Sequence, residues 1–265
     1  MTEAKWLAWP DAYDMLEQCR CCALTERKLR LFACACCRRV WHLLEDDRLR
    51  RAIDITEQFA DSRAIPAQLA DARTAAEEFR DAYVSRHWPD EDPEYEGEPS
   101  KLPSEGRWAV RHAAEAVVHA AARDGDDGVP YLHRAESVIL AACQAVGCAF
   151  AESSGQTEDT FASINAYIRS TQGAEDAERA AQANLLRDIF GNPYRPIAMD
   201  PSWLTPGVLA LARAIDEKGA PARMPALGEA LQHAGCDQPE ILAHCHSAGN
   251  HVRGCWVLDA VLGKA

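Results

Sequence analysis

The chain has 265 residues, of which 48% are hydrophobic and 26% are charged. This length allows one large domain or two smaller ones with a substantial buried core. The 28 Lys and Arg residues against 41 Asp and Glu residues give a formal net charge of -13. Because that charge repels a polyanion, the composition argues against broad binding to nucleic acid.

Localisation follows from the N-terminal sequence and the cysteines. The opening residues, MTEAKWLAWPDAYDMLEQ, lack a basic segment followed by an apolar one, so no signal peptide is expected. The longest apolar stretch, residues 138–151, is too short to cross ~30 Å of hydrocarbon. The 11 cysteines are odd in number, and adjacent pairs such as Cys36–Cys37 rarely meet disulfide geometry. We therefore expect a soluble cytoplasmic protein whose thiols mostly fill the core, with no membrane contact.

Helical periodicity organises residues 1–88. Thr25 is placed to cap a helix over residues 26–44, whose apolar positions recur at helical spacing. A second helix covers residues 49–60, and Pro66 suits the first turn of a third. No window alternates with the period of two that a strand requires. Residues 1–88 are thus predicted to be N-terminal helices.

Three further segments follow. Residues 89–106 are acidic and proline-rich, which is typical of a linker or loop. Residues 107–190 form an Ala-rich helical segment that ends before Gly191, a plausible helix C-cap. Residues 191–265 read as a module of short helices ending at glycines, one of them starting with the capping-box spacing of Asp237 and Glu240. The predicted fold is all-α: a helical bundle with a C-terminal module of short helices.

The most specific candidate site lies near the C-terminus. Cys236, Cys245, His251 and Cys255 have the spacing C-x8-C-x5-H-x3-C, and His244 offers a further nitrogen beside Cys245, as does His246. This resembles the spacing of CCCH zinc fingers with the last two ligand types exchanged. Thiolate and imidazole are the ligands that zinc prefers, and four protein ligands indicate a structural ion. The alternative is that these cysteines are ordinary core thiols on helices.

An N-terminal cysteine group offers a weaker candidate for zinc. Cys19, Cys22, Cys34 and Cys37 have the spacing C-x2-C-x11-C-x2-C. Cys37, however, also falls on the apolar face of the helix predicted over residues 26–44. Burial in the core therefore explains its position equally well.

A third candidate for a metal lies in the Ala-rich segment. His112, Glu115 and His119 share one helix face, and His133 with Glu136 repeats the His-x-x-Glu pair further along. Carboxylates and imidazoles on facing helices can build a metal site within a bundle. The alternative is a solvated polar face, because such pairs arise readily in helices of this composition.

Basic residues could form a positive strip for nucleic acid. They are Arg27, Lys28, Arg30, Arg38, Arg39, Arg48, Arg50 and Arg51, with Arg253 and Trp256 near the C-terminus. Nearby acids balance the strip, so a salt-bridged helix surface is the alternative. The sequence contains no phosphate-binding G-x-x-x-x-G-K-[ST], no G-x-G-x-x-G, no H-E-x-x-H and no G-x-S-x-G motif.

Two blocks of the chain resemble an uncharacterised bacterial protein family with no known activity. The first comprises MTEAKWLAW and RKLRLFACACCRRVWHLL, and the second runs from LLRDIFGNPYRP through MPALGEALQHAGC to ILAHCHSAGNHVRGCWVLDAVLGK. The resemblance implies that residues 1–88 and 191–265 pack as one unit around a variable helical insert, and it implies no catalytic residue. The first cysteines, Cys19, Cys21 and Cys22, depart from the family pattern. The C-terminal Cys and His residues lie inside the more specific block.

These observations favour a helical protein-interaction or regulatory module with a structural zinc ion, more plausibly a binding protein than an enzyme. We expect its partner to be another protein. The alternatives are a helical metalloenzyme that uses the His and Glu residues of the Ala-rich segment, and a nucleic-acid-associated factor that uses the basic strip.

Overall fold

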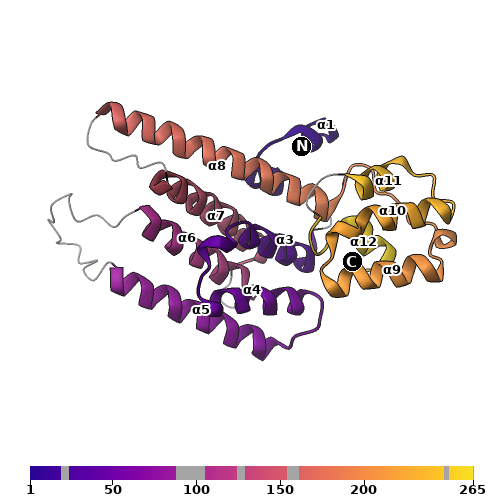
Figure 1. Ribbon diagram of the computed structural model, residues 1–265, viewed down its shortest axis with the longest axis horizontal. Helices are drawn as coiled ribbons and strands as arrows, with labels where there is room; N and C mark the ends of the chain where they lie inside the picture. Colours follow the sequence, from indigo (N-terminus) through magenta and orange to yellow (C-terminus); the bar gives the residue numbers. More distant parts are fainter. Residues whose placement is uncertain (19–23, 88–104, 124–128, 154–160, 248–250, 265) are drawn as a thin grey trace.

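The computed structural model (Figure 1) describes residues 1–18, 24–87, 105–123, 129–153, 161–247 and 251–264. These residues form 12 α-helices and no strand, which confirms the all-α prediction. A long bundle carries a compact group of short helices at one end. The linker predicted over residues 89–106 falls almost entirely outside the described residues.

Five helices make up the N-terminal part of the bundle. They are α1 (Glu3–Ala8), α2 (Ala12–Gln18), α3 (Glu26–Arg39), α4 (Asp47–Ala60) and α5 (Pro66–His87). Thr25 caps α3 as predicted, and its hydroxyl accepts a hydrogen bond from the Lys28 N–H at 3.3 Å. Pro66 occupies the first position of α5, where its missing N–H removes no helical hydrogen bond.

Helix α3 is shorter than the sequence predicted. It ends at Arg39, and the chain continues as a 3-10 turn over Trp41–Leu43. The Val40 N–H bonds the Cys37 carbonyl, so the last turn tightens. Val40 and Leu44 nevertheless remain fully buried. The apolar period therefore identified the buried face correctly but not the end of the helix.

The core of the bundle joins the N-terminal helices to the Ala-rich segment. Helices α6 (Glu105–Ala120), α7 (Tyr131–Ser153) and α8 (Phe161–Phe190) pack against α3, and one hydrophobic cluster runs through all of them. Alanines supply many of the buried positions on α6 and α7, which form the most extensive helix pair in the described chain. Small side chains allow two helix backbones to approach closely.

The single apolar helix long enough to cross a membrane, among the described residues, is α7. More than half of its apolar window is buried inside the protein. It packs against α3, α6 and α8, as a core helix of a soluble protein does.

The C-terminal module has a hydrophobic core of its own. It contains α9 (Pro206–Lys218), α10 (Met224–His233), α11 (Pro239–His246) and α12 (Trp256–Leu262), together with 3-10 turns over Pro201–Trp203 and Pro221–Arg223. Glycines end α9 and α12 in the left-handed conformation, as predicted. The predicted capping box is wrong, because Gln238 is the N-cap of α11 and makes no side-chain hydrogen bond to its first turn.

Polar contacts fasten the module to the bundle. The Arg27 guanidinium of α3 pairs with the Asp259 carboxylate of α12 at 2.7 Å, and the Arg63 guanidinium pairs with the Asp216 carboxylate of α9 at 2.6 Å. Residues 1–88 thus share their core with residues 107–190. Their contacts with residues 191–265, which the resemblance groups with them in one unit, include apolar ones beside these ion pairs, because Val252 packs against the core of the bundle and Gly254 lies close to Leu31.

Candidate metal centre

Four side chains meet where the end of the bundle touches the C-terminal module. Asp188 lies in the last turn of α8, and His244 lies in α11. His251 belongs to the loop that follows α11, and Cys255 immediately precedes α12. One ligand atom from each residue lies within 4.8 Å of the other three.

The same four atoms account for every short contact in the group. Oδ1 of Asp188 lies 2.8 Å from Nδ1 of His251 and 3.3 Å from Nε2 of His244. Sγ of Cys255 lies 3.0 Å from that Nε2 and 3.9 Å from that Nδ1. Zinc bonds of 2.0–2.3 Å in a tetrahedron place ligand atoms roughly 3.3–3.8 Å apart. The observed separations bracket this range, so small shifts would complete a tetrahedral site.

Neighbouring groups orient the ligand atoms. The second carboxylate oxygen of Asp188 accepts a hydrogen bond from the Val252 N–H at 2.9 Å. The outer nitrogen of His251 lies 3.5 Å from the Ser247 hydroxyl. The ring of His244 packs against Trp256, with 5.2 Å between ring centroids. Such outer contacts are the usual support of metal ligands, because they fix which atom faces the ion.

Burial sets the charges of the centre. Burial raises the pKa of the Cys255 thiol well above its ordinary value, and the nearby Asp188 carboxylate adds to the effect. Burial would also raise the pKa of Asp188, but hydrogen bonds from His244, His251 and the Val252 N–H outweigh it and lower that pKa. A metal ion would therefore find the Asp188 carboxylate already ionised, and it would displace the proton of the Cys255 thiol on binding.

The geometry does not suit a Cys-His-Asp nucleophilic relay. In such a relay the carboxylate and the nucleophile engage opposite nitrogens of the imidazole. Here Asp188 and Cys255 both face Nε2 of His244. The Cys255 residue is also only 1% exposed. Convergence on one point is the arrangement that a metal ion requires.

The structure brings together two of the four ligands predicted from the spacing C-x8-C-x5-H-x3-C. His251 and Cys255 belong to the centre, whereas Cys236 and Cys245 are buried in the core of the C-terminal module. Successive residues on a helix point about 100° apart, so Cys245 turns away when His244 faces the centre. A methyl group at Gly228 of α10 would lie 2.8 Å from the Cβ of Cys245, which shows how closely that side of α11 packs.

Asp188 is the member of this cluster that sequence reasoning missed. It follows Leu185 and Leu186 and precedes Ile189, all of them buried. An acid within such an apolar run is a signal of a specific partner, because an unpaired buried carboxylate is costly. The sequence alone did not say which distant residue would be that partner.

The Ala-rich segment does not form a metal site in the described chain. Its candidates were His112, Glu115, His119, His133 and Glu136, and they do not gather into a group of convergent ligand atoms. His112 instead stacks on Trp108, with 5.9 Å between ring centroids. Burial lowers the pKa of both His112 and His119.

The described cysteines of the N-terminal zinc candidate lie in the core of the bundle. Cys19 and Cys22 lie outside the described residues. Cys34, Cys36 and Cys37 are fully buried in the bundle core, and burial raises the pKa of each thiol. They therefore fill interior space, as the alternative interpretation stated.

Much of the basic strip is paired with acids. Ion pairs hold Arg27, Arg38, Arg39 and Arg48 against carboxylates. Arg30 is 1% exposed and donates to the Ala120 and Ala122 carbonyls. These contacts correspond to a salt-bridged helix surface over this part of the strip, whereas Lys28 donates to the neutral Ile189 carbonyl and Arg50 lies over the Trp41 ring.

Two hollows flank the centre. Asp188 and His244 line one of about 380 Å³, beside Arg39 and Ser247. His251 and Cys255 line the other, a cleft of about 530 Å³ between the bundle and the C-terminal module. The four residues of the cluster thus lie between two hollows of the protein surface.

Comparison with protein-family models, with curated proteins and with solved structures finds no match.

Proposed function

We propose that this protein is a cytoplasmic zinc-binding protein of the interaction or regulatory type. Asp188, His244, His251 and Cys255 would hold one structural zinc ion. The observation that carries the proposal is the convergence of four different donor atoms on one point, with Asp188 and Cys255 facing the same nitrogen of His244.

The donor set favours zinc over other common ions. Two imidazoles, one thiolate and one carboxylate match the ligands of zinc, whereas Ca²⁺ and Mg²⁺ prefer oxygen alone. Four protein ligands complete a tetrahedron and leave no open position for substrate. This coordination supports a structural ion and a binding role, in agreement with the absence of catalytic motifs from the sequence.

The position of the ligands suggests what the ion does. Asp188 belongs to the last helix of the bundle, and the other three belong to the C-terminal module. A metal bound between them would stabilise the docked arrangement, since the site exists only when the two parts meet. A reducing location agrees with the cysteines, because the eight in the described residues are all free thiols.

Metal analysis tests the proposal. Protein purified without chelator should contain one zinc per chain, and Cys255→Ala should lose it. The matched control is Cys245→Ala, which removes a buried thiol of the same module that the structure places outside the centre. After substitution of cobalt for zinc, the thiolate-to-cobalt charge-transfer band should vanish in Cys255→Ala and persist in Cys245→Ala. A zinc-free wild type, or equal zinc loss in both variants with unchanged helical content, would refute it.

A further inference from the structure

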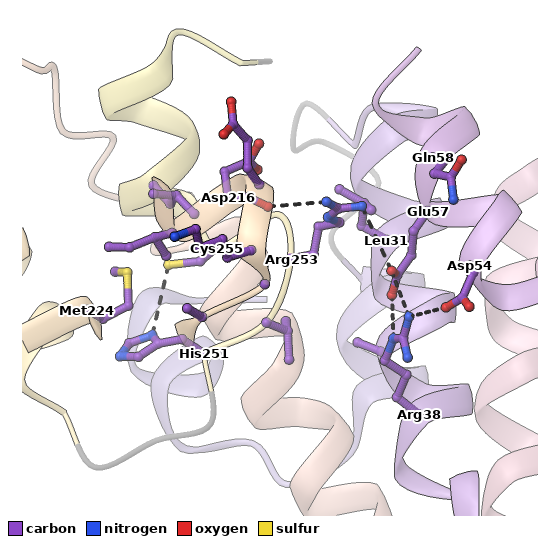
Figure 2. Close-up of a pocket in the computed structure, with 18 residues that line it drawn as sticks. Leu31, Arg38, Asp54, Glu57, Gln58, Asp216, Met224, His251, Arg253 and Cys255 are labelled. Atoms are coloured by element: carbon purple, nitrogen blue, oxygen red, sulfur yellow. Dashed lines mark hydrogen bonds and ion pairs between the residues drawn. The ribbon is translucent and has the colours of Figure 1, made fainter. Parts of the chain in front are cut away.

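The cleft on one side of the candidate metal centre, of about 530 Å³, is larger than the hollow of about 380 Å³ on the other side. It lies between α3 and α4 of the bundle and the end of α9 with the loop 251–255 of the C-terminal module (Figure 2). Its volume of about 530 Å³ falls within the range of small-molecule sites, roughly 300–1,000 Å³.

Apolar side chains supply much of the lining of the cleft. They are Leu31, Ala35, Ile215, Met224, Val252 and Leu258. The loop 251–255 approaches α3 closely, because a methyl group at Gly254 would lie only 2.8 Å from Leu31. Burial of apolar ligand surface against these side chains would supply affinity at roughly 25 cal/mol per Å².

The charged side chains of the cleft belong to a network of ion pairs in which positive and negative charges balance. Ion pairs connect five cations with five carboxylates across the junction; the cations are Arg27, Arg38, Arg63, Arg253 and Lys264, and the carboxylates are Asp54, Glu57, Asp61, Asp216 and Asp259. Glu217 and Lys218 also line the cleft and add one charge of each sign.

A charged ligand would disturb this balance, whereas an uncharged one would not. The cleft also offers a group that can form hydrogen bonds with such a ligand. The Gln58 side chain lies on the wall of the cleft, half-buried and without a hydrogen-bond partner among the described residues (Figure 2). Its amide can both donate and accept.

The cleft and the metal centre share a wall. His251 and Cys255 are ligand candidates and also line the cleft. Between them, the Arg253 guanidinium donates to the Asp216 carbonyl at 3.2 Å and lies 4.0 Å from Glu57 of α4 (Figure 2). Fixing the ends of this five-residue loop with a metal ion would therefore fix the shape of the cleft.

We infer that this cleft binds an uncharged, largely apolar small molecule with a hydrogen-bonding group, and that it binds this molecule more tightly when the metal centre is occupied. The second half of the inference rests on the proposed zinc site, whereas the first half rests on the cleft alone. Because the cleft spans the junction, its occupant would act on how the two parts dock.

Fluorescence titration with prodan, an uncharged naphthalene ketone, tests the inference on the full-length protein. The zinc-loaded wild type should bind one dye molecule per chain. Gln58→Trp, which places a large ring at the cleft wall, should weaken binding about tenfold or more. The control Gln144→Trp places the same ring on the exposed face of α7, and it should leave binding unchanged. Removal of zinc with a chelator should weaken binding about fivefold or more.

The outcomes separate the two proposals. Absence of dye binding to the zinc-loaded wild type, or equal binding to Gln58→Trp, overturns the cleft site while the measured zinc content still supports the centre. Equal affinity with and without zinc overturns the linkage. Dye binding that Gln58→Trp abolishes in a protein that never takes up zinc supports the cleft, overturns the linkage and refutes the proposed function.

Discussion

Replacement of Gly254 by alanine should destabilise the protein through two separable effects. Gly254 has a φ of +86°, a backbone conformation that costs an alanine about 1–2 kcal/mol. The added methyl group would also lie 2.8 Å from Cδ1 and 3.3 Å from Cβ of Leu31. Relieving that overlap costs about 1–3 kcal/mol. Gly254→Ala should therefore lower the free energy of unfolding by about 2–5 kcal/mol in total.

Gly235→Ala is the matched control. Gly235 has a φ of +95°, but its added methyl group would meet no atom within 4 Å. Urea denaturation should give a cost of about 1–2 kcal/mol for this variant, from backbone strain alone. In a Leu31→Ala background, the cost of Gly254→Ala should fall toward the cost of Gly235→Ala. The reasoning is refuted if the two glycine variants cost the same, or if Leu31→Ala leaves the cost of Gly254→Ala unchanged.

Four further predictions concern other parts of the molecule. Free zinc at about a thousandfold excess over its Kd should stabilise the wild type by about 4 kcal/mol in a thermal melt, and an unshifted melt contradicts the centre. Salt bridges to Lys264 and Arg63 outweigh the effect of burial and lower the pKa of Asp216 in the folded protein. The ionised Asp216 therefore stabilises the fold at pH values above its unfolded pKa of about 3.9, and this stabilisation is lost as the pH falls through the folded pKa. Asp216→Asn should therefore be less stable than the wild type at pH 7, and the gap should close in acid; a gap independent of pH contradicts the ion pairs. Arg30→Met should lower the free energy of unfolding, measured by urea denaturation, by about 1–3 kcal/mol, because it leaves the Ala122 carbonyl without the hydrogen bond that Arg30 donates. Iodoacetamide should label the three buried cysteines of α3 only after unfolding, because burial raises their thiol pKa values. Labelling of these cysteines in the native protein, detected by mass spectrometry, would contradict their burial.

The fold was largely predictable because its helices carry local signals. Thr25 caps α3, and Gly191 and Gly219 follow the ends of α8 and α9, as their sequence positions indicated. Two helix ends were misplaced. Helix α3 ends at Arg39 in a tightened last turn, and α11 begins after Gln238, where Pro239 at the first helical position was a local signal that the capping-box interpretation overlooked.

The candidate site was half predictable for a related reason. His251 and Cys255 lie four residues apart in one loop, so spacing found them. Asp188 is 63 residues from His251, and only the docking of the two hydrophobic cores brings them together. Cys245 matched the spacing pattern, but the 100° step of the helix turned it to the other side. The spacing of residues along the sequence predicts neither which distant segments pack together nor which face of a helix a given side chain lies on.

The alanine-rich pairing of α6 and α7 limits how this protein can evolve. At positions such as Ala113, Ala116 and Ala142 the side chain is fully buried, so a larger residue would wedge the helices apart and a glycine would weaken each helix by up to about 1 kcal/mol. Mutational drift in the bundle is therefore confined to the solvent-facing sides of these helices. In variants of this chain, the α6–α7 contact should remain composed of small residues even where the surrounding surface has diverged.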